Sequence, residues 1–345
     1  MPNRRHYLSL TATAIAAGLA GCAGANNSPA GATTADGTTD ARTPTTTATA
    51  SQDTSEEETT TASGSVNAVI GEPVEGGRLS LVVEDVRRGV DLDESNEASA
   101  GNEFALVSLA LKNTATEYVT VSNRLQTRLR DDANYTYAPT FADTDAATFT
   151  NGQLAPGEVE RGDIPFEIPT GASGLDLLSD ADSSLFGNLD LAIIDLASEA
   201  DRIHVLAHSL QVDVYEPGDT VEQGSVQVTI TDYRTAESLG DGAEPAADTE
   251  YAVVDISITN NSGEQHQLST ARQMLLKDGA GYTYQADIAA TSHLNRPFDD
   301  ATLLGAGETR RGQLVYEAPA DASPLYWTFE FGLFASGNKM FWKVQ

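Results

Sequence analysis

Two histidines in this sequence have a spacing that suits a metal ion. His204 and His208 lie four residues apart and follow Asp201. On a helix or on a strand, this spacing directs both imidazoles to roughly one side, and neutral imidazole is a common metal ligand. A second interpretation needs no metal, because residues 202–210 also resemble a closing β-strand that matches residues 339–344. Both interpretations stay open at this point.

A run of acids, Asp91, Asp93 and Glu94, offers carboxylate oxygens of the kind that Ca²⁺ prefers. The run departs from the calcium-loop pattern, because its sixth position is not glycine and Asn102 stands where a bidentate glutamate is expected. An acidic surface loop is therefore the competing interpretation.

Motifs for catalysis do not appear in the sequence. The Gly-x-Ser-x-Gly elbow of many hydrolases is missing. Paired acids such as Asp143 and Asp145 have the side chains that glycoside hydrolysis uses, but nothing in the sequence fixes their separation. We therefore expect no catalytic residue and no cofactor, and an extracellular hydrolase is the least favoured function.

The N-terminus has the pattern of an export signal. Arg4 and Arg5 precede a weakly apolar stretch that ends in Leu-Ala-Gly-Cys at residues 19–22, the order of a twin-arginine signal followed by a lipobox. The stretch is shorter than the roughly 20 residues that a membrane-spanning helix needs. The pattern predicts cleavage after residue 21, a lipid on Cys22, and a mature protein anchored to the outer face of the cell membrane. An ordinary secretory signal and a buried thiol at Cys22 are the alternatives.

The sequence is acidic, with a net charge of −31 over 345 residues, and only four of its 20 basic residues are lysines. An acidic, lysine-poor composition resembles that of proteins from extreme halophiles, where 1 M salt screens like charges over about 3 Å. An acidic surface that binds cations is the alternative. Nucleic acid is not an expected partner, because proteins bind its phosphates mainly with lysine and arginine.

Residues 22–65 are rich in threonine, serine and alanine and contain no aromatic residue. Such a segment cannot bury enough apolar surface to fold, so we predict a disordered stalk, either glycosylated or plain. Candidate N-glycosylation sequons begin at Asn26, Asn134 and Asn260. At Asn260, a structural role at the end of a strand is the alternative.

The remaining sequence repeats itself with a shift of 147 residues, which grows by three after an insertion. The aligned pairs are GNEFALV at 101–107 with DTEYAVV at 248–254, DDANYTY at 131–137 with DGAGYTY at 278–284, and LAPGE at 154–158 with LGAGE at 304–308. We therefore predict two homologous domains, residues 66–211 and 212–345, after a signal peptide of residues 1–21.

Each repeat has the alternation of apolar and polar residues that is typical of strands. Residues 251–258 alternate with a period of two, and the matching positions of residues 104–111 are also apolar. About seven short strands per repeat, separated by Gly, Asn, Asp and Pro, predict an all-β fold of two tandem immunoglobulin-like β-sandwiches. Aromatic residues crowd the sequence between Tyr326 and Trp342, where core packing and an exposed ledge for a partner are the two interpretations.

Three short motifs recur in both repeats and resemble a known family. They are a strand that ends in Asn (Asn113 and Asn260), an Asp-Gly-x-x-Tyr turn (Asp278, Gly279 and Tyr282), and a Leu-x-Pro-Gly-Glu turn (residues 154–158) before a strand that closes in Phe-x-x-Pro. The first repeat has Asp132 where Gly is usual, and the second has Ala306 where Pro is usual. The pattern resembles the telokin-like, immunoprotective-extracellular Ig-like domain of prokaryotic lipoproteins, often labelled a domain of unknown function. This resemblance implies an extracytoplasmic, non-enzymatic module and supplies no catalytic residues.

The sequence as a whole favours a non-enzymatic binding or envelope-scaffolding protein. Its expected contacts are the membrane, through the lipid on Cys22, and an envelope protein or a surface glycan. Two linked modules gain avidity without new contacts, which suits the duplication. An accessory solute- or cation-binding lipoprotein is the alternative.

Overall fold

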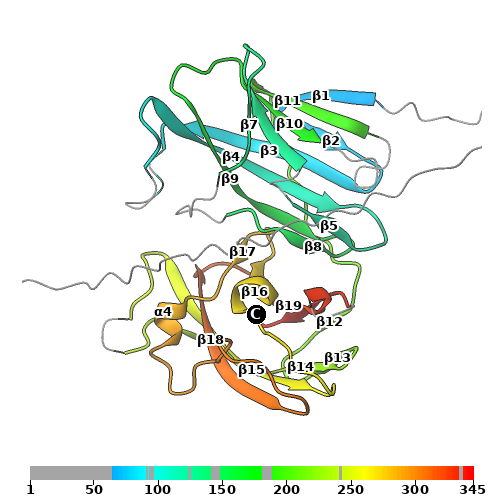
Figure 1. Ribbon diagram of the computed structural model, residues 1–345, viewed down its shortest axis with the longest axis vertical. Helices are drawn as coiled ribbons and strands as arrows, with labels where there is room; N and C mark the ends of the chain where they lie inside the picture. The colour runs from blue at the N-terminus through cyan, green and yellow to red at the C-terminus, as the bar shows by residue number, and fades with distance from the viewer. Residues whose placement is uncertain are drawn as a thin grey trace, which may run out of the picture. The chain divides into compact units, whose positions relative to one another are not determined.

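The computed structural model contains two β-sandwiches that follow each other along the chain (Figure 1). It describes residues 64–90, 92, 97–122, 126–140, 148–180, 189–240, 243–333 and 337–345, all within one compact unit, Thr59–Gln345. No helix in this described part is long and apolar enough to span a membrane. The predicted signal peptide and the stalk up to residue 63 lie outside the described residues.

The first sandwich consists of two sheets and a short ribbon. Its strands are β1 (Gly64–Ile70), β2 (Pro73–Glu75), β3 (Leu79–Arg88), β4 (Asn102–Asn113), β5 (Val119–Val121), β6 (Thr127–Arg130), β7 (Thr136–Tyr137), β8 (Gly152–Leu154), β9 (Val159–Pro169), β10 (Asp176–Asp180) and β11 (Leu189–Glu199). The order β2-β3-β4-β9 forms one sheet, β1-β11-β10-β6-β7 forms the other, and β5 pairs with β8. Strand β1 runs parallel to β11, and the other pairs are antiparallel.

The second sandwich repeats this architecture. Its strands are β12 (Val214–Tyr215), β13 (Thr220–Gln223), β14 (Val226–Ala236), β15 (Thr249–Asn260), β16 (Met274–Asp278), β17 (Thr283–Tyr284), β18 (Thr309–Pro319), β19 (Leu325–Glu330) and β20 (Lys339–Lys343), with α3 (Thr270–Gln273), α4 (Ile288–Thr291) and the 3-10 helix η1 (Phe331–Leu333) between them. The sheets have the orders β13-β14-β15-β18 and β12-β20-β19-β16-β17. The predicted pair of tandem β-sandwiches is confirmed.

The two sandwiches also share an irregularity in strand pairing at equivalent positions. The pairing of β3 with β4 shifts between Val83 and Asp85, and the pairing of β14 with β15 shifts between Ile230 and Asp232, which are the equivalent positions. A bulge bends a strand and increases its twist. Both sandwiches therefore curve their long central strands at the same place.

Each sandwich has its own hydrophobic core, formed by the inward residues of its two sheets. In the second sandwich, Trp327, Phe329, Phe331 and Trp342 are at most 1% exposed, and the two indole rings meet edge to face with centroids 5.5 Å apart. These four aromatic residues therefore pack in the core and do not form an exposed ledge.

The strand-ending asparagines are buried and close the turns that follow them. Asn113 donates from Nδ2 to the carbonyl oxygens of Glu117 (2.8 Å) and Leu154 (2.9 Å) and accepts from Ala115 N–H (2.9 Å). Asn260 makes the equivalent set of bonds in the second sandwich. Because a buried amide must be hydrogen-bonded, this motif needs asparagine at both positions.

The two turn motifs are held by carboxylates. Asp278 accepts from the N–H of Tyr282 (2.9 Å) and from the hydroxyl of Tyr284 (2.8 Å), and Asp131 accepts from the equivalent tyrosines of the first sandwich. Glu158 accepts from Ala155 N–H, and Glu308 accepts from Gly305 N–H, both at 2.7 Å. A side chain that bonds its own backbone in this way fixes a turn.

The connection between the sandwiches contains no strand over residues 200–213. The prediction that residues 202–210 form a closing strand is therefore wrong, since β11 already completes the first sandwich. The connection instead crosses the sheet face opposite the core, where Leu206 packs against Val82, Ala110 and Val159. One buried leucine anchors the segment, and its neighbours Val205 and Ala207 are exposed.

Replacing Gly157 by alanine tests how firmly the connection docks. Gly157 has φ +78°, and a Cβ there would lie 1.8 Å from Ser209 O, whereas its counterpart Gly307 has φ +70° and no atom within 4 Å of that position. Gly307→Ala should cost about 1–2 kcal/mol of unfolding free energy, the penalty of a left-handed non-glycine residue. Gly157→Ala should cost clearly more, as measured by denaturant titration. Equal losses would contradict the docking.

Candidate functional site

Most of the N-terminal candidates lie where the structure gives no description. Cys22, Arg4, Arg5, Asn26, Asp91, Asp93 and Glu94 are outside the described residues. The lipid anchor, the export signal and the calcium-like loop therefore stay predictions.

The two histidines do not come together as a metal pair. His204 is exposed, whereas His208 is half-buried and its Nδ1 accepts from Val159 N–H (3.3 Å). The regular spacing on which the pairing depended is lost, because this segment forms neither a strand nor a helix. In the part of the chain that the structure describes, no three residues of the types His, Cys, Asp or Glu are grouped to hold a metal ion.

The two described sequons have opposite environments. Asn134 is exposed in the turn between β6 and β7 and has φ +62°. Asn260 is 0% exposed, and its Nδ2 donates to the carbonyl oxygens of Glu264 (2.6 Å) and Gly305 (3.0 Å). The folded protein therefore has no room for a glycan on Asn260, and the structural role is the one that this residue performs.

The two sandwiches meet where β9 of the first contacts the β16–β17 turn of the second. Arg161 donates from its backbone N–H to Gly281 O (2.9 Å), its guanidinium contacts Ala280 O, and its Cζ lies 5.6 Å from the centroid of the Tyr282 ring. The same guanidinium pairs with Glu84 at 3.0 Å. The turn that Asp278 shapes is thus one of the elements that dock the second sandwich onto the first.

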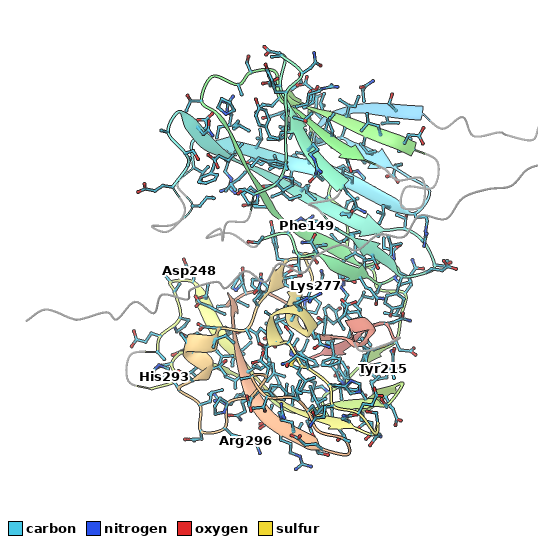
Figure 2. All side chains as sticks on the ribbon, in the orientation of Figure 1. Phe149, Tyr215, Asp248, Lys277, His293 and Arg296 are labelled. Atoms are coloured by element: carbon cyan, nitrogen blue, oxygen red, sulfur yellow. The ribbon has the colours of Figure 1, made fainter. Side chains whose placement is uncertain are left out.

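Four charged residues are buried beside this contact, and we call them the junction cluster: Glu158, Glu160, Lys277 and Lys339. They are 0%, 2%, 1% and 8% exposed, respectively. Lys277 Nζ pairs with Glu160 and lies 3.0 Å from Glu158, while Lys339 Nζ lies 2.5 Å from Glu158. The carboxylates come from the first sandwich and the ammonium groups from the second (Figure 2 labels Lys277 where the two meet).

The cluster satisfies its own hydrogen-bonding groups. Thr283 Oγ1 donates to Glu160 (3.0 Å) and lies 3.2 Å from Lys277 Nζ. Burial alone would raise the pKa of Glu158, but Lys339 and Lys277 outweigh that effect and hold the pKa below its ordinary value. Burial likewise disfavours the charged form of Lys277, and Glu160 and Glu158 outweigh it and raise the lysine pKa. Glu158 and Lys277 are therefore both charged when the protein is folded at neutral pH.

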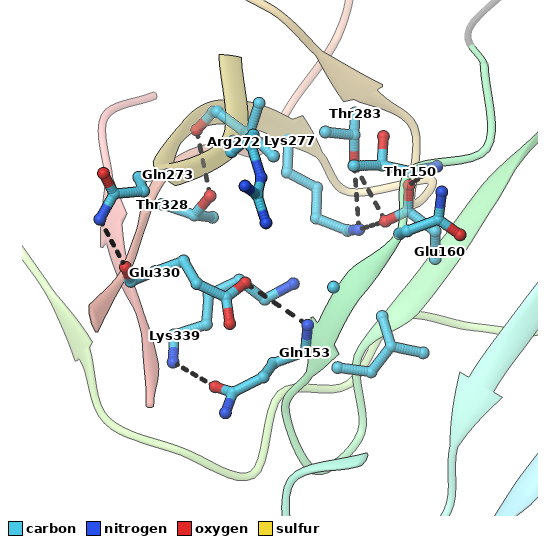
Figure 3. A pocket seen from close by; sticks show the side chains of 14 residues that line it. Thr150, Gln153, Glu160, Arg272, Gln273, Lys277, Thr283, Thr328, Glu330 and Lys339 are labelled. Carbon is cyan, nitrogen blue, oxygen red and sulfur yellow. Dashed lines mark hydrogen bonds and ion pairs between the residues drawn. The ribbon is translucent and has the colours of Figure 1, made fainter. Parts of the chain in front are cut away.

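A small polar cavity lies beside the cluster and has a volume of about 20 Å³, enough for one water molecule. Figure 3 shows Arg272 directed into the space between Lys277 and Glu330. Burial raises the pKa of Glu330, an effect that Lys339 partly offsets. A hydrogen bond from the backbone also joins the two sandwiches here, because the N–H of Lys339 donates to the side-chain Oε1 of Gln153 (3.0 Å).

A larger open hollow of about 560 Å³ adjoins this cavity. It shares Gln153, Arg272 and Glu330 with the cavity and adds Phe149 and Gln285 to the wall. Its charged groups are one guanidinium and one carboxylate, and the rest of its described polar wall is amide and hydroxyl. A volume of this size is within the range of small-molecule sites.

The fold and the junction define the class of the protein as a tandem β-sandwich whose two domains share a buried ionic contact. Its sequence matches the family described as a domain of unknown function (DUF4352) over residues 68–188 and again over residues 215–340. Because the two matches cover more than half of the sequence, the chain belongs to the DUF4352 family. No curated protein matches the sequence.

Several solved structures are similar to part of the chain. The yjhA protein from Bacillus subtilis is 19% identical, with a TM-score of 0.30 over 37% of this chain and 99% of its own. A β-sandwich protein from Clostridium difficile is 17% identical, with a TM-score of 0.28 over 40% of this chain and 98% of its own. The secreted protein MPT63 from Mycobacterium tuberculosis is 11% identical, with a TM-score of 0.30 over 39% and 99%.

The junction cluster is not evident from the sequence. Lys277 and Glu160 are 117 positions apart, so no local pattern joins them. All four lysines of the sequence lie in strands that contain apolar residues. The pattern therefore does not distinguish the buried Lys277 and Lys339 from Lys343, which is exposed.

Replacing Lys277 by methionine tests the energy of the junction cluster. The variant leaves Glu160 buried without its cation, so we expect a loss of about 3–5 kcal/mol in unfolding free energy, measured by denaturant titration at constant salt. Lys343→Met removes an exposed lysine of the same sheet and should change stability by less than about 0.5 kcal/mol. Adding Glu160→Gln to Lys277→Met should restore part of the loss. A loss no larger than that of the control would show that the cluster is not buried in solution.

The unfolding free energy should depend on pH through the protonation of His208. Burial, followed by the charge of Lys277, lowers the pKa of His208 from 6.5 to about 4. Because the histidine pKa is lowered by folding, the unfolded chain binds the proton at a higher pH than the folded chain does. The stability that neutral His208 contributes is therefore fully present above pH 6.5 and is lost as the pH falls towards 4. The full loss is about 3 kcal/mol. His208→Asn keeps an acceptor for Val159 N–H without titrating, and its unfolding free energy should lack this slope. An unchanged slope in the variant would assign the loss to other groups.

Proposed function

We propose that this chain is a non-enzymatic binding or scaffolding protein of the cell envelope, in which the two sandwiches act as one rigid head on a flexible stalk. The observation that carries the proposal is the junction cluster. Two domains joined only by a linker would each present their loops independently. Two domains joined by buried ion pairs present their loops at one spacing and one angle.

A fixed spacing matters for binding because it removes an entropic cost. When two modules are held in the geometry of their target, the second contact forms without ordering a linker. The buried pairs are also little affected by salt, since screening acts mainly on exposed charges. The head therefore keeps its geometry in the concentrated salt that the acidic composition suggests.

The location in the proposal rests on the N-terminal pattern. Arg4 and Arg5, followed by a lipobox at Cys22, support export and lipidation, and the resemblance to telokin-like domains of lipoproteins supports the same compartment. The acidic, lysine-poor composition supports a haloarchaeal-type source. The threonine-rich stalk then separates the head from the membrane surface.

The proposal of a non-enzymatic role rests on how the buried carboxylates are used. Glu158 and Glu160 bind lysines, and Glu158 also accepts from a turn N–H. A general acid or base needs to reach a substrate proton, and these two carboxylates are enclosed by their own partners. They are better suited to joining domains than to chemistry.

A second candidate function is the binding of a small polar solute in the open hollow. Arg272 and Glu330 supply one charge of each sign in its wall, and Gln153 and Gln285 supply amides. This candidate corresponds to the solute-binding lipoprotein that the sequence left as an alternative. The hollow offers less enclosure than a deep pocket, which is why scaffolding is the preferred function.

Crosslinking on intact cells tests the proposed function. Because the chain has four lysines and two of them are buried, the tagged protein should carry a photoactivated crosslinker in place of a lysine reagent. We expect reproducible capture of one envelope protein or glycan in native salt. Lys277→Met, which loosens the head, should reduce that capture, whereas Lys343→Met should not. Capture of bulk surface protein alone, equal in all three proteins, would contradict scaffolding and favour the solute.

A further inference from the structure

The turn between β6 and β7 of the first sandwich makes none of the junction contacts described above, although its counterpart in the second sandwich docks onto Arg161. In the second sandwich, Arg161 covers Tyr282 and contacts the carbonyl oxygens of the preceding residues. In the first, the equivalent Tyr135 is 68% exposed, and it is the one tyrosine among the exposed large hydrophobic residues of the described chain. The same turn is therefore presented to solvent with its tip uncovered.

Residue 134 explains why this turn cannot dock in the same way. Its counterpart, Gly281, has φ +101°, and a Cβ there would lie 2.9–3.1 Å from atoms of Val159. Asn134 has a Cβ and a longer side chain at this position, with φ +62°. Asparagine tolerates the left-handed region better than most residues. The first sandwich therefore keeps the turn conformation and loses the close approach.

Asn134 is also the first residue of an Asn-Tyr-Thr sequon. Its side chain is exposed, and the amide has no hydrogen-bond partner within the described part of the chain. Thr136, the third residue of the sequon, is exposed as well. Asp131 holds the turn rigid by accepting from Tyr135 N–H (2.8 Å) and from the Tyr137 hydroxyl (2.7 Å).

We propose that Asn134 is an N-glycosylation site and that Asn260 is not, although both begin sequons. The amide nitrogen of Asn134 forms a bond to the anomeric carbon of a sugar. The bond between that carbon and the phosphate oxygen of a glycosyl phosphate donor breaks, the phosphate leaves with the electron pair, and the amide loses one proton. The exposed ring of Tyr135 provides an apolar surface beside the first sugar. Asn260 cannot react in the folded protein, because its Nδ2 is already bonded to backbone carbonyl oxygens.

The site rests on the extracytoplasmic location in the proposed function, since glycosyl transfer of this kind acts on exported proteins. The test uses the full chain isolated from the cells that make it and mass spectrometry of its tryptic peptides. Cleavage at arginine separates the two sequons, into residues 131–161 and 235–272. We expect a sugar mass on the first peptide and none on the second.

Three variants identify the attachment. Asn134→Asp keeps a residue that tolerates the turn but removes the amide, so it should abolish the added mass. Thr136→Ala should abolish it too, and Thr136→Ser should retain it. An unmodified first peptide, or a mass that survives Asn134→Asp, overturns the proposal. Surface labelling of the same cells shows whether the proposed location fails with it, because a labelled protein without sugar contradicts the site alone.

Discussion

The arrangement of the described chain depends on bringing two carboxylates and two ammonium groups out of water together. Glu158 directly precedes β9 and Glu160 is its second residue, whereas Lys277 and Lys339 lie on strands of the other sandwich. Each charge would be costly to bury alone. The sandwiches can therefore meet closely only in the register that pairs all four, and any slip leaves a charge without its partner. We infer that the cluster acts mainly by selecting one docking geometry, and less by adding net stability.

A comparison of the repeats explains why the docking occurs once. Glu160 corresponds to Arg310, and Lys277 corresponds to Arg130. Arg310 pairs with Glu308 of its own turn at 2.9 Å, and Arg130 pairs with Asp176 at 2.5 Å. A further copy of the first sandwich, docked onto the second in the same way, would place its arginine at position 130 against Arg310. Two arginines would then face each other where an ion pair is needed. The two repeats thus share a fold, but their surfaces differ: the first supplies the carboxylates of the contact and the second supplies the ammonium groups.

The fold could be predicted from the sequence because its determinants are local or repeated. Alternation over residues 104–111 identifies a strand, and the repetition of Asp131 as Asp278 identifies the same turn twice. The junction cluster could not be predicted in this way, since it joins residues from different repeats. The histidine pair failed for a related reason: the spacing of His204 and His208 carries geometric meaning only inside a regular element, and residues 200–213 form neither a strand nor a helix.

The surroundings of the cluster show how a lysine-poor, acidic chain can retain lysines. On the surface of a protein, water and dissolved ions screen each ion pair, so an exposed lysine contributes little. Inside the junction the charges are buried and salt screens them less, and an ammonium group with its compact charge can bind two carboxylates and a threonine hydroxyl at once, as Lys277 does. Arginine is larger and planar, and it serves at the edge of the junction, where Arg161 reaches a ring and backbone carbonyls. The distribution of the two cations thus follows from the space and the water available to each.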